Sequence, residues 1–201
     1  MKVSIVKYNA GNIFSVINAV KRLGIEPLWT DNPEELMASD RVIFPGQGEA
    51  SNAMEYLRKR NLDKVIADLK QPVLGICIGQ QLLCEHSEEG DTDCIGIFPT
   101  KVKRFQPNKH EEKVPCMGWN SLELIHNSDG VSPLFKGLGE KDYVYFVHSY
   151  YCELCENTIA QSDYILPYSA ALQKDNFFAT QFHPEKSGMV GHKIIENFVN
   201  L

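Results

Sequence analysis

The chain has 201 residues, 43% of them hydrophobic, which suits one domain that folds without a disulfide or a metal. Its net charge is -6, with no basic stripe, and this disfavours nucleic acid or an anionic membrane as the main partner. Only four uncharged residues separate Lys2 from Lys7, too few for a signal peptide, and no apolar run reaches membrane-spanning length. We therefore expect a cytoplasmic protein whose six cysteines are thiols, metal ligands or a nucleophile.

Short apolar runs alternate with amphipathic segments in the first half of the chain. We predict strands at residues 3–8, 27–30, 41–46 and 71–76. We predict helices at residues 12–24, 31–38, around Leu62, Val65, Ile66 and Leu69, and at 79–87. This alternation predicts a parallel sheet with helices on both faces, and sites in such sheets form at the carboxyl ends of strands. Three such ends are residues 8–11, 45–48 and 75–79.

The second half, from about Asp91, is richer in strands. Strand-like runs separated by turn residues are expected at 93–105, 114–125, 143–154, 158–164 and 168–184, before a closing amphipathic helix at 191–201. We find no repeat and no linker. The predicted fold class is α/β: an open, mostly parallel sheet covered by helices on both faces, with a β-rich second half, in one domain over residues 1–201.

The segment Gly75-Ile-Cys-Ile-Gly79 has the G-x-C-x-G form of a nucleophile elbow, in which a strand turns sharply into a helix. Small flanking residues are needed because the nucleophile's backbone is strained and the helix packs close to the strand. At a helix N-terminus the dipole favours a Cys77 thiolate, and the Ile78 amide can donate to an oxyanion. Taken alone, a buried cysteine at the end of a core strand is the more common interpretation.

A second segment, QFHPEKSG, changes that balance. His183 and Glu185 flank a proline that holds the preceding stretch extended, and residues two apart on an extended backbone face the same way. We expect the Glu185 carboxylate to orient the His183 imidazole, which serves Cys77 as base and then as acid. A chance His-Pro-Glu in a turn is common, so the elbow and this triplet are informative only together.

A third segment, FPGQGEAS, follows the third predicted strand. Gly46 and Gly48 flank Gln47, and two glycines so spaced let backbone amides approach a ligand closely, as an oxyanion site requires. An ordinary strand-to-helix turn is an equally good interpretation of this segment by itself.

With Cys77, His183 and Glu185 in this order, the sequence resembles the class I (triad) glutamine amidotransferases. Within that family it is most similar to the glutaminase subunits of imidazole glycerol phosphate synthases, of the histidine pathway. The resemblance runs almost from end to end, through YNAGN, PGQG, GICIGQQLL, HSEEG, VPCMGWN, YFVHSYY and QFHPEKS. The elbow and His-Pro-Glu identify the superfamily, and MGWN, YFVHSY and the Lys-Ser after His-Pro-Glu narrow it to these subunits.

The resemblance implies a role for each site residue. Cys77 attacks the side-chain amide carbon of glutamine, His183 moves the proton to the departing ammonia, Glu185 holds the imidazole, and water cleaves the glutamyl thioester. It also implies oxyanion donors at Ile78 and in the Gly46–Gln47 peptide. The residues expected to hold or line the substrate site are Gly48, Gln81, Glu89, Ser149 and Tyr150. We expect no metal and no cofactor.

Three positions depart from the family's usual residues. The family usually has a small apolar residue at Gln47 and a methionine at Gln80, and many members have a histidine at Cys116. Gln47 lies in the expected oxyanion turn, where its side chain can alter how that turn rearranges. None of the three is a triad position, so the expected activity stands.

The resemblance also implies a partner. Ammonia in neutral water is mostly protonated, so its use as a nucleophile needs a shielded path to a second active site, for which this chain has no room. The implied partner is a (β/α)8-barrel cyclase, which forms a heterodimer with this chain and makes imidazole glycerol phosphate and an aminoimidazole carboxamide ribotide. Candidate docking segments are YNAGN, MGWN and Tyr143–Tyr145, although Trp119 is nearly as well suited to a core.

Other residues leave alternatives open. Cys152-Glu-Leu-Cys155 has the spacing of zinc and redox sites, but no second such pair accompanies it. Cys84 is expected on the helix after the elbow, as a packed core thiol. His148 is expected either to line the glutamine pocket or to satisfy a backbone carbonyl.

Three other functions fit the motifs less well. The same glutaminase chemistry can serve a paralogous synthase, such as one that amidinates sugars, and co-purification with its barrel subunit discriminates this case. A cysteine hydrolase on the same elbow would turn over without a partner. A non-catalytic regulatory subunit is disfavoured because the triad is complete.

Overall fold

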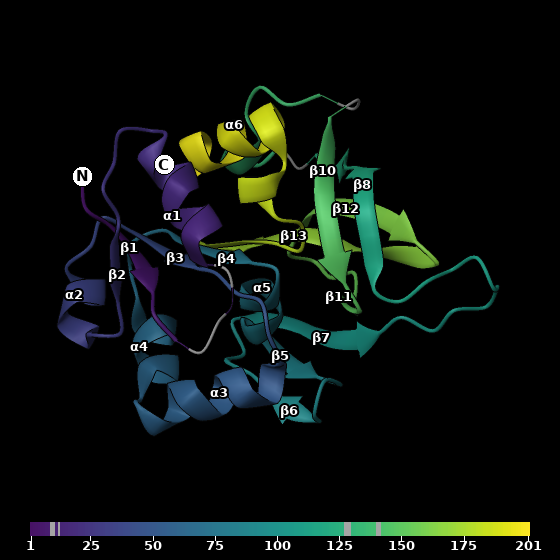
Figure 1. Ribbon diagram of the computed structural model, residues 1–201, viewed down its shortest axis with the longest axis horizontal. Helices are drawn as coiled ribbons and strands as arrows, with labels where there is room; N and C mark the ends of the chain where they lie inside the picture. The colour runs from purple at the N-terminus through teal and green to yellow at the C-terminus, as the bar shows by residue number, and fades with distance from the viewer. Residues whose placement is uncertain (9–10, 12, 127–129, 140–141) are drawn as a thin grey trace.

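Strands and helices alternate through the first half of the chain, as predicted. The computed structural model describes residues 1–8, 11, 13–126, 130–139 and 142–201 (Figure 1). The first half contains β1 (Val3–Val6), α1 (Ile13–Lys21), β2 (Leu28–Thr30), α2 (Pro33–Met37), β3 (Arg41–Phe44), α3 (Ala50–Lys59), α4 (Leu62–Asp68), β4 (Val73–Ile76), α5 (Ile78–Leu82) and β5 (Cys84–Ser87).

The second half is mostly strands. It contains β6 (Thr92–Asp93), β7 (Phe98–Arg104), β8 (Cys116–Ser121), β9 (Glu123–Leu124), β10 (Tyr143–His148), β11 (Tyr150–Cys152), β12 (Thr158–Tyr164), β13 (Leu166–Lys174), β14 (Phe177–Thr180) and α6 (Gly188–Val199). Short 3-10 turns lie at Pro133–Phe135 and Pro184–Lys186. The closing helix, α6, begins at Gly188, three residues earlier than the helix predicted at 191–201.

One large sheet runs through the molecule in the order β2-β1-β3-β4-β14-β13-β11-β7-β5-β6, with β12 beside β13 and β9 beside β12. Neighbouring strands from β2 to β14 are parallel, and β14, β13, β11 and β7 then pair antiparallel in turn. β8 and β10 form a separate antiparallel pair. This arrangement confirms the predicted fold class, an open and mostly parallel α/β sheet with a β-rich second half.

The parallel part of the sheet is covered on both faces, with α1 and α6 on one side and α3 and α4 on the other (Figure 1). Successive residues of β4 join opposite cores, because side chains alternate along a strand. Leu74 packs in the core that contains Val16 of α1 and Phe198 of α6. Val73 packs in the core that contains Leu57 of α3 and Ile66 of α4. Among the described residues, no helix has both the length and the apolar character needed to cross a bilayer.

Two predicted helices differ from those observed. Two helices rather than one lie between β3 and β4, and the break is at Asn61, whose φ of 54° is left-handed. The predicted helix 79–87 stops at Leu82, and Cys84–Ser87 forms β5, paired in parallel with β7. The partner strand lies 14–15 residues further along the chain, so pairing between separate segments overrides the local helical composition.

We predict that Leu74→Ala lowers the free energy of unfolding by about 2–5 kcal/mol, because this side chain is fully buried and belongs to β4, the strand that leads into the turn at Cys77. The matched control is Leu154→Ala, whose side chain is 47% exposed and whose effect should stay within about 0.5 kcal/mol. Urea unfolding followed by circular dichroism measures both, and equal losses would contradict the assignment of this core.

Candidate active site

Cys77 occupies the sharp turn between β4 and α5. Its φ of 54° and ψ of -107° form a conformation that residues with a side chain rarely adopt. Its amide donates to the Thr180 carbonyl of β14 at 2.7 Å. A Cβ added at Gly79 would lie 2.0 Å from the Phe44 carbonyl oxygen, and one at Gly75 would lie 2.9 Å from the Gly79 backbone. Glycine at both positions is therefore what allows α5 to lie against the sheet.

His183 and Glu185 form a buried pair next to the elbow. The His183 amide donates to the Tyr145 carbonyl of β10 at 2.9 Å, which fixes the backbone after β14. Its Nδ1 lies 2.8 Å from Oε1 of Glu185, and the side chains are 2% and 3% exposed. Glu185 belongs to the 3-10 turn Pro184–Lys186 rather than to the extended stretch predicted. The contact forms all the same, since proline also starts a helical turn.

The charge on His183 is coupled to Cys77. Burial by itself lowers the pKa of His183, but the charge of Cys77, and after it the hydrogen bond and charge of Glu185, raise that pKa above its usual value of 6.5. Among the described residues, His183 Nε2 has no hydrogen-bond partner. This nitrogen therefore interacts with the Cys77 sulfur through charge. The imidazole is therefore placed to hold a proton that the thiol gives up.

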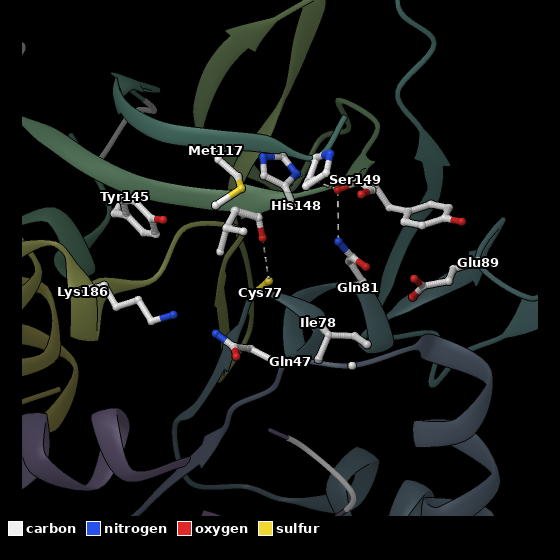
Figure 2. Close-up of a pocket in the computed structure, with 14 residues that line it drawn as sticks. Gln47, Cys77, Ile78, Gln81, Glu89, Met117, Tyr145, His148, Ser149 and Lys186 are labelled. Carbon is white, nitrogen blue, oxygen red and sulfur yellow. Dashed lines mark hydrogen bonds between the residues drawn. The ribbon is translucent and has the colours of Figure 1, made fainter. Parts of the chain in front are cut away.

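A cavity of about 470 Å³ opens in front of the Cys77 sulfur (Figure 2). This volume lies in the range of small-molecule sites. All five predicted substrate residues line it, and Gln47 and Ile78 do so as well. The complete lining is Gln47, Gly48, Cys77, Ile78, Gln81, Glu89, Pro115, Met117, Tyr145, Val147, His148, Ser149, Tyr150 and Lys186.

Three other predicted site residues line a different space. Gly46, His183 and Glu185 border a separate hollow of about 10 Å³, with Gln47 common to both spaces. Of the atypical positions, Gln80 is fully buried away from the main cavity and donates its Nε2 to the Ser169 carbonyl at 3.0 Å.

Two polar residues of the cavity are fixed by backbone groups. The Gln81 Nε2 donates to the Tyr150 carbonyl at 3.1 Å. Oε2 of Glu89 accepts from the Ala50 amide at the start of α3, at 2.8 Å. Burial raises the pKa of Glu89 above its usual value, and the Ala50 amide opposes that rise. Both side chains therefore present polar atoms to the cavity in defined positions.

The glycine turn, residues 45–48 after β3, is held by a hydrogen bond on each side. The Tyr8 hydroxyl donates to the Pro45 carbonyl, and the Gly11 amide donates to the Gln47 carbonyl at 2.9 Å. A Cβ on Gly46 would lie 2.0 Å from the Tyr8 hydroxyl and 2.2 Å from Cγ2 of Ile78, so this position admits only glycine. The three predicted strand ends thus meet at one edge of the sheet.

A family profile described as glutamine amidotransferase class-I matches residues 5–201 of this sequence. The chain belongs to the class-I glutamine amidotransferase family.

The curated relatives of this amidotransferase are similar to it over its whole length. Imidazole glycerol phosphate synthase subunit HisH of Bacteroides fragilis is 58% identical over 201 residues, which cover 100% of both chains. The subunit of the same name from Bacteroides thetaiotaomicron is 56% identical with the same coverage. That from Colwellia psychrerythraea is 41% identical, covering 98% of this chain and 92% of the relative.

Solved structures share the fold of this amidotransferase at low sequence identity. A putative GMP synthase subunit from Thermoplasma acidophilum has a TM-score of 0.75 at 22% identity, covering 100% of this chain and 93% of that chain. A structure described as a glutamine amidotransferase has a TM-score of 0.74 at 20% identity, with 100% and 98% coverage. These likenesses establish the fold class.

His148 fits both interpretations that the sequence allows for it. In this amidotransferase it lines the cavity, and its Nδ1 donates to the Tyr150 carbonyl at 2.7 Å. Its ring also lies 5.3 Å, centroid to centroid, from those of Phe105 and Tyr168. Burial lowers the pKa of His148 to about 4, with His183 adding to the effect and the Tyr150 hydrogen bond opposing it. The imidazole is therefore neutral at pH 7.

The other cysteines are poor nucleophiles or lie away from the cavity. All six, each within the described part of the chain, are free thiols. Burial raises the pKa of Cys94 to about 12 and that of Cys116 to about 11, and burial and Cys152 raise the pKa of Cys84. A thiol held protonated attacks slowly. Cys77 is thus distinguished by its neighbours as well as by its motif.

One cysteine of the C-x-x-C motif contacts a third cysteine. Cys152 lies in β11 with its sulfur 3.5 Å from that of Cys84, which begins β5 and is not helical as predicted. Cys84 is nevertheless a fully buried core thiol, as expected. Over the described residues, no group of three or more His, Cys, Asp or Glu side chains is arranged to hold a metal ion.

The β8–β10 pair, which contributes Met117 to the cavity, also carries exposed apolar side chains. On the β8–β10 pair, Met117 is 65%, Trp119 55% and Tyr143 52% exposed, and Trp119 packs edge-on against Tyr145 at 5.9 Å between ring centroids. The core role considered for Trp119 is therefore wrong. Within the predicted docking segment YNAGN, residues Asn9, Ala10 and Asn12 lie outside the described residues.

Several further residues lie within the motifs quoted from the sequence but were given no role in this site. Lys186 and Met117 line the cavity, Tyr8 holds the glycine turn, and Gln181 contacts the sulfur. Lys186 and Gln181 lie within the quoted QFHPEKS, so their proximity to His183 is a signal in the sequence. Tyr8 and Met117 reach the site only through the sheet topology.

We predict that His148→Gln flattens the dependence of stability on pH. The pKa of this histidine is about 4 when folded and about 6.5 when unfolded, so between these values only the unfolded chain takes up the proton. The stability is fully present above pH 6.5 and falls as the pH drops towards 4. Relative to the variant, the wild type should lose roughly 3 kcal/mol over this range in urea unfolding experiments. His110→Gln, an exposed control, should keep the wild-type slope, and parallel curves for wild type and His148→Gln would refute the assignment.

Proposed function

We propose that this chain hydrolyses glutamine to glutamate and ammonia as the glutaminase subunit of an imidazole glycerol phosphate synthase. One observation carries the proposal: the strained Cys77 lies beside the buried His183–Glu185 pair, at the wall of a cavity of about 470 Å³. The names and full-length similarity of the HisH relatives support the assignment to this synthase. We further propose that residues 1–201 form one amidotransferase domain.

The geometry supports a two-step hydrolysis. The Cys77 sulfur attacks the side-chain amide carbon of glutamine, and His183 carries the proton to the departing ammonia. Glu185 keeps the imidazole oriented through its hydrogen bond to Nδ1. Water then attacks the thioester, with His183 as base, and releases glutamate. The Ile78 amide, at the start of α5, and the Gly46–Gln47 peptide are the proposed oxyanion donors.

Gln81, Glu89, Ser149, Tyr150 and Gly48 are proposed to hold the substrate. Their support is that all five line the cavity that contains the sulfur. Gln81 and Glu89 offer side-chain oxygens suited to the substrate's ammonium group, while Gly48 leaves room for close approach of the backbone.

The proposed partner is a (β/α)8-barrel cyclase, which receives the ammonia and makes imidazole glycerol phosphate and the carboxamide ribotide in histidine biosynthesis. The relatives are named as subunits, which supports an assembly with a second chain. The β8–β10 pair carries Met117, which lines the cavity, and the exposed Trp119 and Tyr143, and aromatic residues with methionine are typical of interface centres. Ammonia leaving the cavity there would enter a covered path. The six free thiols support the reducing cytoplasm as the location.

We predict that Cys77→Ala, reconstituted with a cyclase, loses glutamine-dependent synthesis by roughly 10⁴-fold or more, because the nucleophile is removed. Synthesis supplied with ammonia should be retained, because the cyclase site is untouched. Cys155→Ala is the matched control and should retain both activities, since Cys155 lies outside the cavity. Continued synthesis from glutamine by Cys77→Ala would exclude this nucleophile.

The glycine turn is the proposed switch of the glutaminase. The carbonyls of Pro45 and Gln47 are held by Tyr8 and Gly11, so rotation of the Gly46–Gln47 peptide between them leaves both hydrogen bonds intact. Such a flip changes whether the Gln47 amide points at the oxyanion, and the flanking glycines ease it.

We therefore predict low glutaminase turnover in the isolated chain and an increase of roughly 10²-fold with the cyclase and its bound nucleotide, the typical value of one oxyanion donor. Glutamate release is measured with the chain alone, with the cyclase, and with the cyclase and its ligand. Full activity of the isolated chain would show that the turn needs no switch.

A further inference from the structure

Gln181 is a fully buried polar residue that lies behind the cavity rather than in its lining. It follows β14 directly, and its amide donates to the Ala170 carbonyl of β13 at 2.8 Å. A side-chain amide has two N–H donors and an accepting oxygen, and burial requires that they be satisfied. The partners of this amide are two residues of the candidate site.

The orientation of two side-chain amides is fixed by one backbone carbonyl. The Tyr150 carbonyl can only accept, so the group of Gln81 that contacts it at 3.1 Å is Nε2. The same nitrogen lies 3.0 Å from Gln181, whose contacting atom must therefore be the oxygen. The Gln181 nitrogen is then on the side of Cys77, with Nε2 3.7 Å from the sulfur. These three contacts therefore allow only one assignment of the oxygen and nitrogen atoms in the two side-chain amides.

For Gln81, the consequence is that both N–H donors are already used. Its oxygen is left as the polar atom that faces the cavity, and Figure 2 shows this oxygen on the side of Glu89. An accepting oxygen beside a carboxylate suits the ammonium group of an amino acid. Without Gln181, the Gln81 amide would lose one of the two bonds that hold it in this direction.

For Cys77, the consequence depends on its protonation state. As a thiol, the sulfur has the Val147 carbonyl within 3.9 Å as an acceptor. As a thiolate it has no proton to donate, and the Gln181 N–H then becomes a donor to a charged acceptor, which is a stronger interaction than one between neutral groups. Gln181 therefore favours the thiolate without touching the cavity.

We propose that Gln181 is a positioning residue that couples the substrate-holding Gln81 to the nucleophile Cys77. One side of its amide sets the direction of Gln81, and the other side stabilises the Cys77 thiolate. The inference rests on the proposed glutaminase function for its kinetic part only, because the reactivity of the sulfur can be measured without substrate.

Two substitutions of Gln181 distinguish its contact with Gln81 from its contact with Cys77. Gln181→Glu keeps an oxygen that accepts from Gln81 but replaces the donor to Cys77 with a carboxylate. Gln181→Met has similar length and removes both hydrogen bonds. Cys77 alkylation by iodoacetamide is followed in the full chain by peptide mass spectrometry from pH 6 to 9, and kcat and KM for glutamine are measured in the complex with the cyclase.

We expect Gln181→Glu to slow Cys77 alkylation at pH 7 by about tenfold or more, to move its midpoint to higher pH, and to lower kcat with KM within about twofold of wild type. Gln181→Met should slow alkylation by about tenfold and also raise KM by about tenfold, because Gln81 loses a partner. Gln106→Glu, on an exposed residue, carries the same charge change and should alter neither alkylation nor kinetics.

Folding of each variant is checked by urea unfolding, and Gln181→Met decides the test alone if the buried carboxylate of Gln181→Glu prevents folding. A folded Gln181→Met whose alkylation rate stays within twofold of wild type would overturn the role toward Cys77. An unchanged KM would overturn the role toward Gln81. Absence of glutaminase activity in the wild-type complex would refute the proposed function, and the alkylation profile would still decide the contact with the sulfur.

Discussion

The contact between Gly79 and the Phe44 carbonyl is the constraint on which the site depends. A Cβ at Gly79 would lie 2.0 Å from that oxygen, so α5 reaches the sheet only because the position is glycine. This approach forces the turn at Cys77 into its left-handed φ and brings Ile78 against Gly46. One steric condition therefore sets the direction of the sulfur, the helix N-terminus beneath it and the place of the glycine turn.

Strands from the second half of the chain hold the polar groups around the sulfur. β14 lies parallel beside β4 and supplies the carbonyl that fixes the Cys77 amide, while the backbone after β14 carries Gln181 and His183. The carbonyl of Tyr150, in β11, accepts from both Gln81 and His148. The polar groups around the sulfur are thus tied to the framework of the sheet, which keeps them in place before a substrate binds.

The exposed face of β8 and β10 lies next to the cavity and is suited to contact with a second chain. It combines apolar side chains in solvent with a cavity mouth lined by Met117 and Tyr145. A hydrolase that released its product to water would have no need of such a rim. A product that must stay uncharged and nucleophilic is protected from water if another chain covers the opening of the cavity. This is the physical reason to consider the surface and the cavity together.

The sequence by itself determined the alternation of strands and helices and the elbow, and it indicated the residues that we propose as the triad, because these features depend on local periodicity and on short motifs with glycine at fixed spacing. It did not determine that residues 84–87 form a strand, that Glu185 sits in a 3-10 turn, or that Trp119 is exposed. It also passed over Gln181, whose partners lie 100 and 104 residues away. The strand at 84–87 and the contacts of Gln181 arise from pairings between separate segments, and only the tertiary structure decided them because their stabilising contacts do not exist until the sheet has formed.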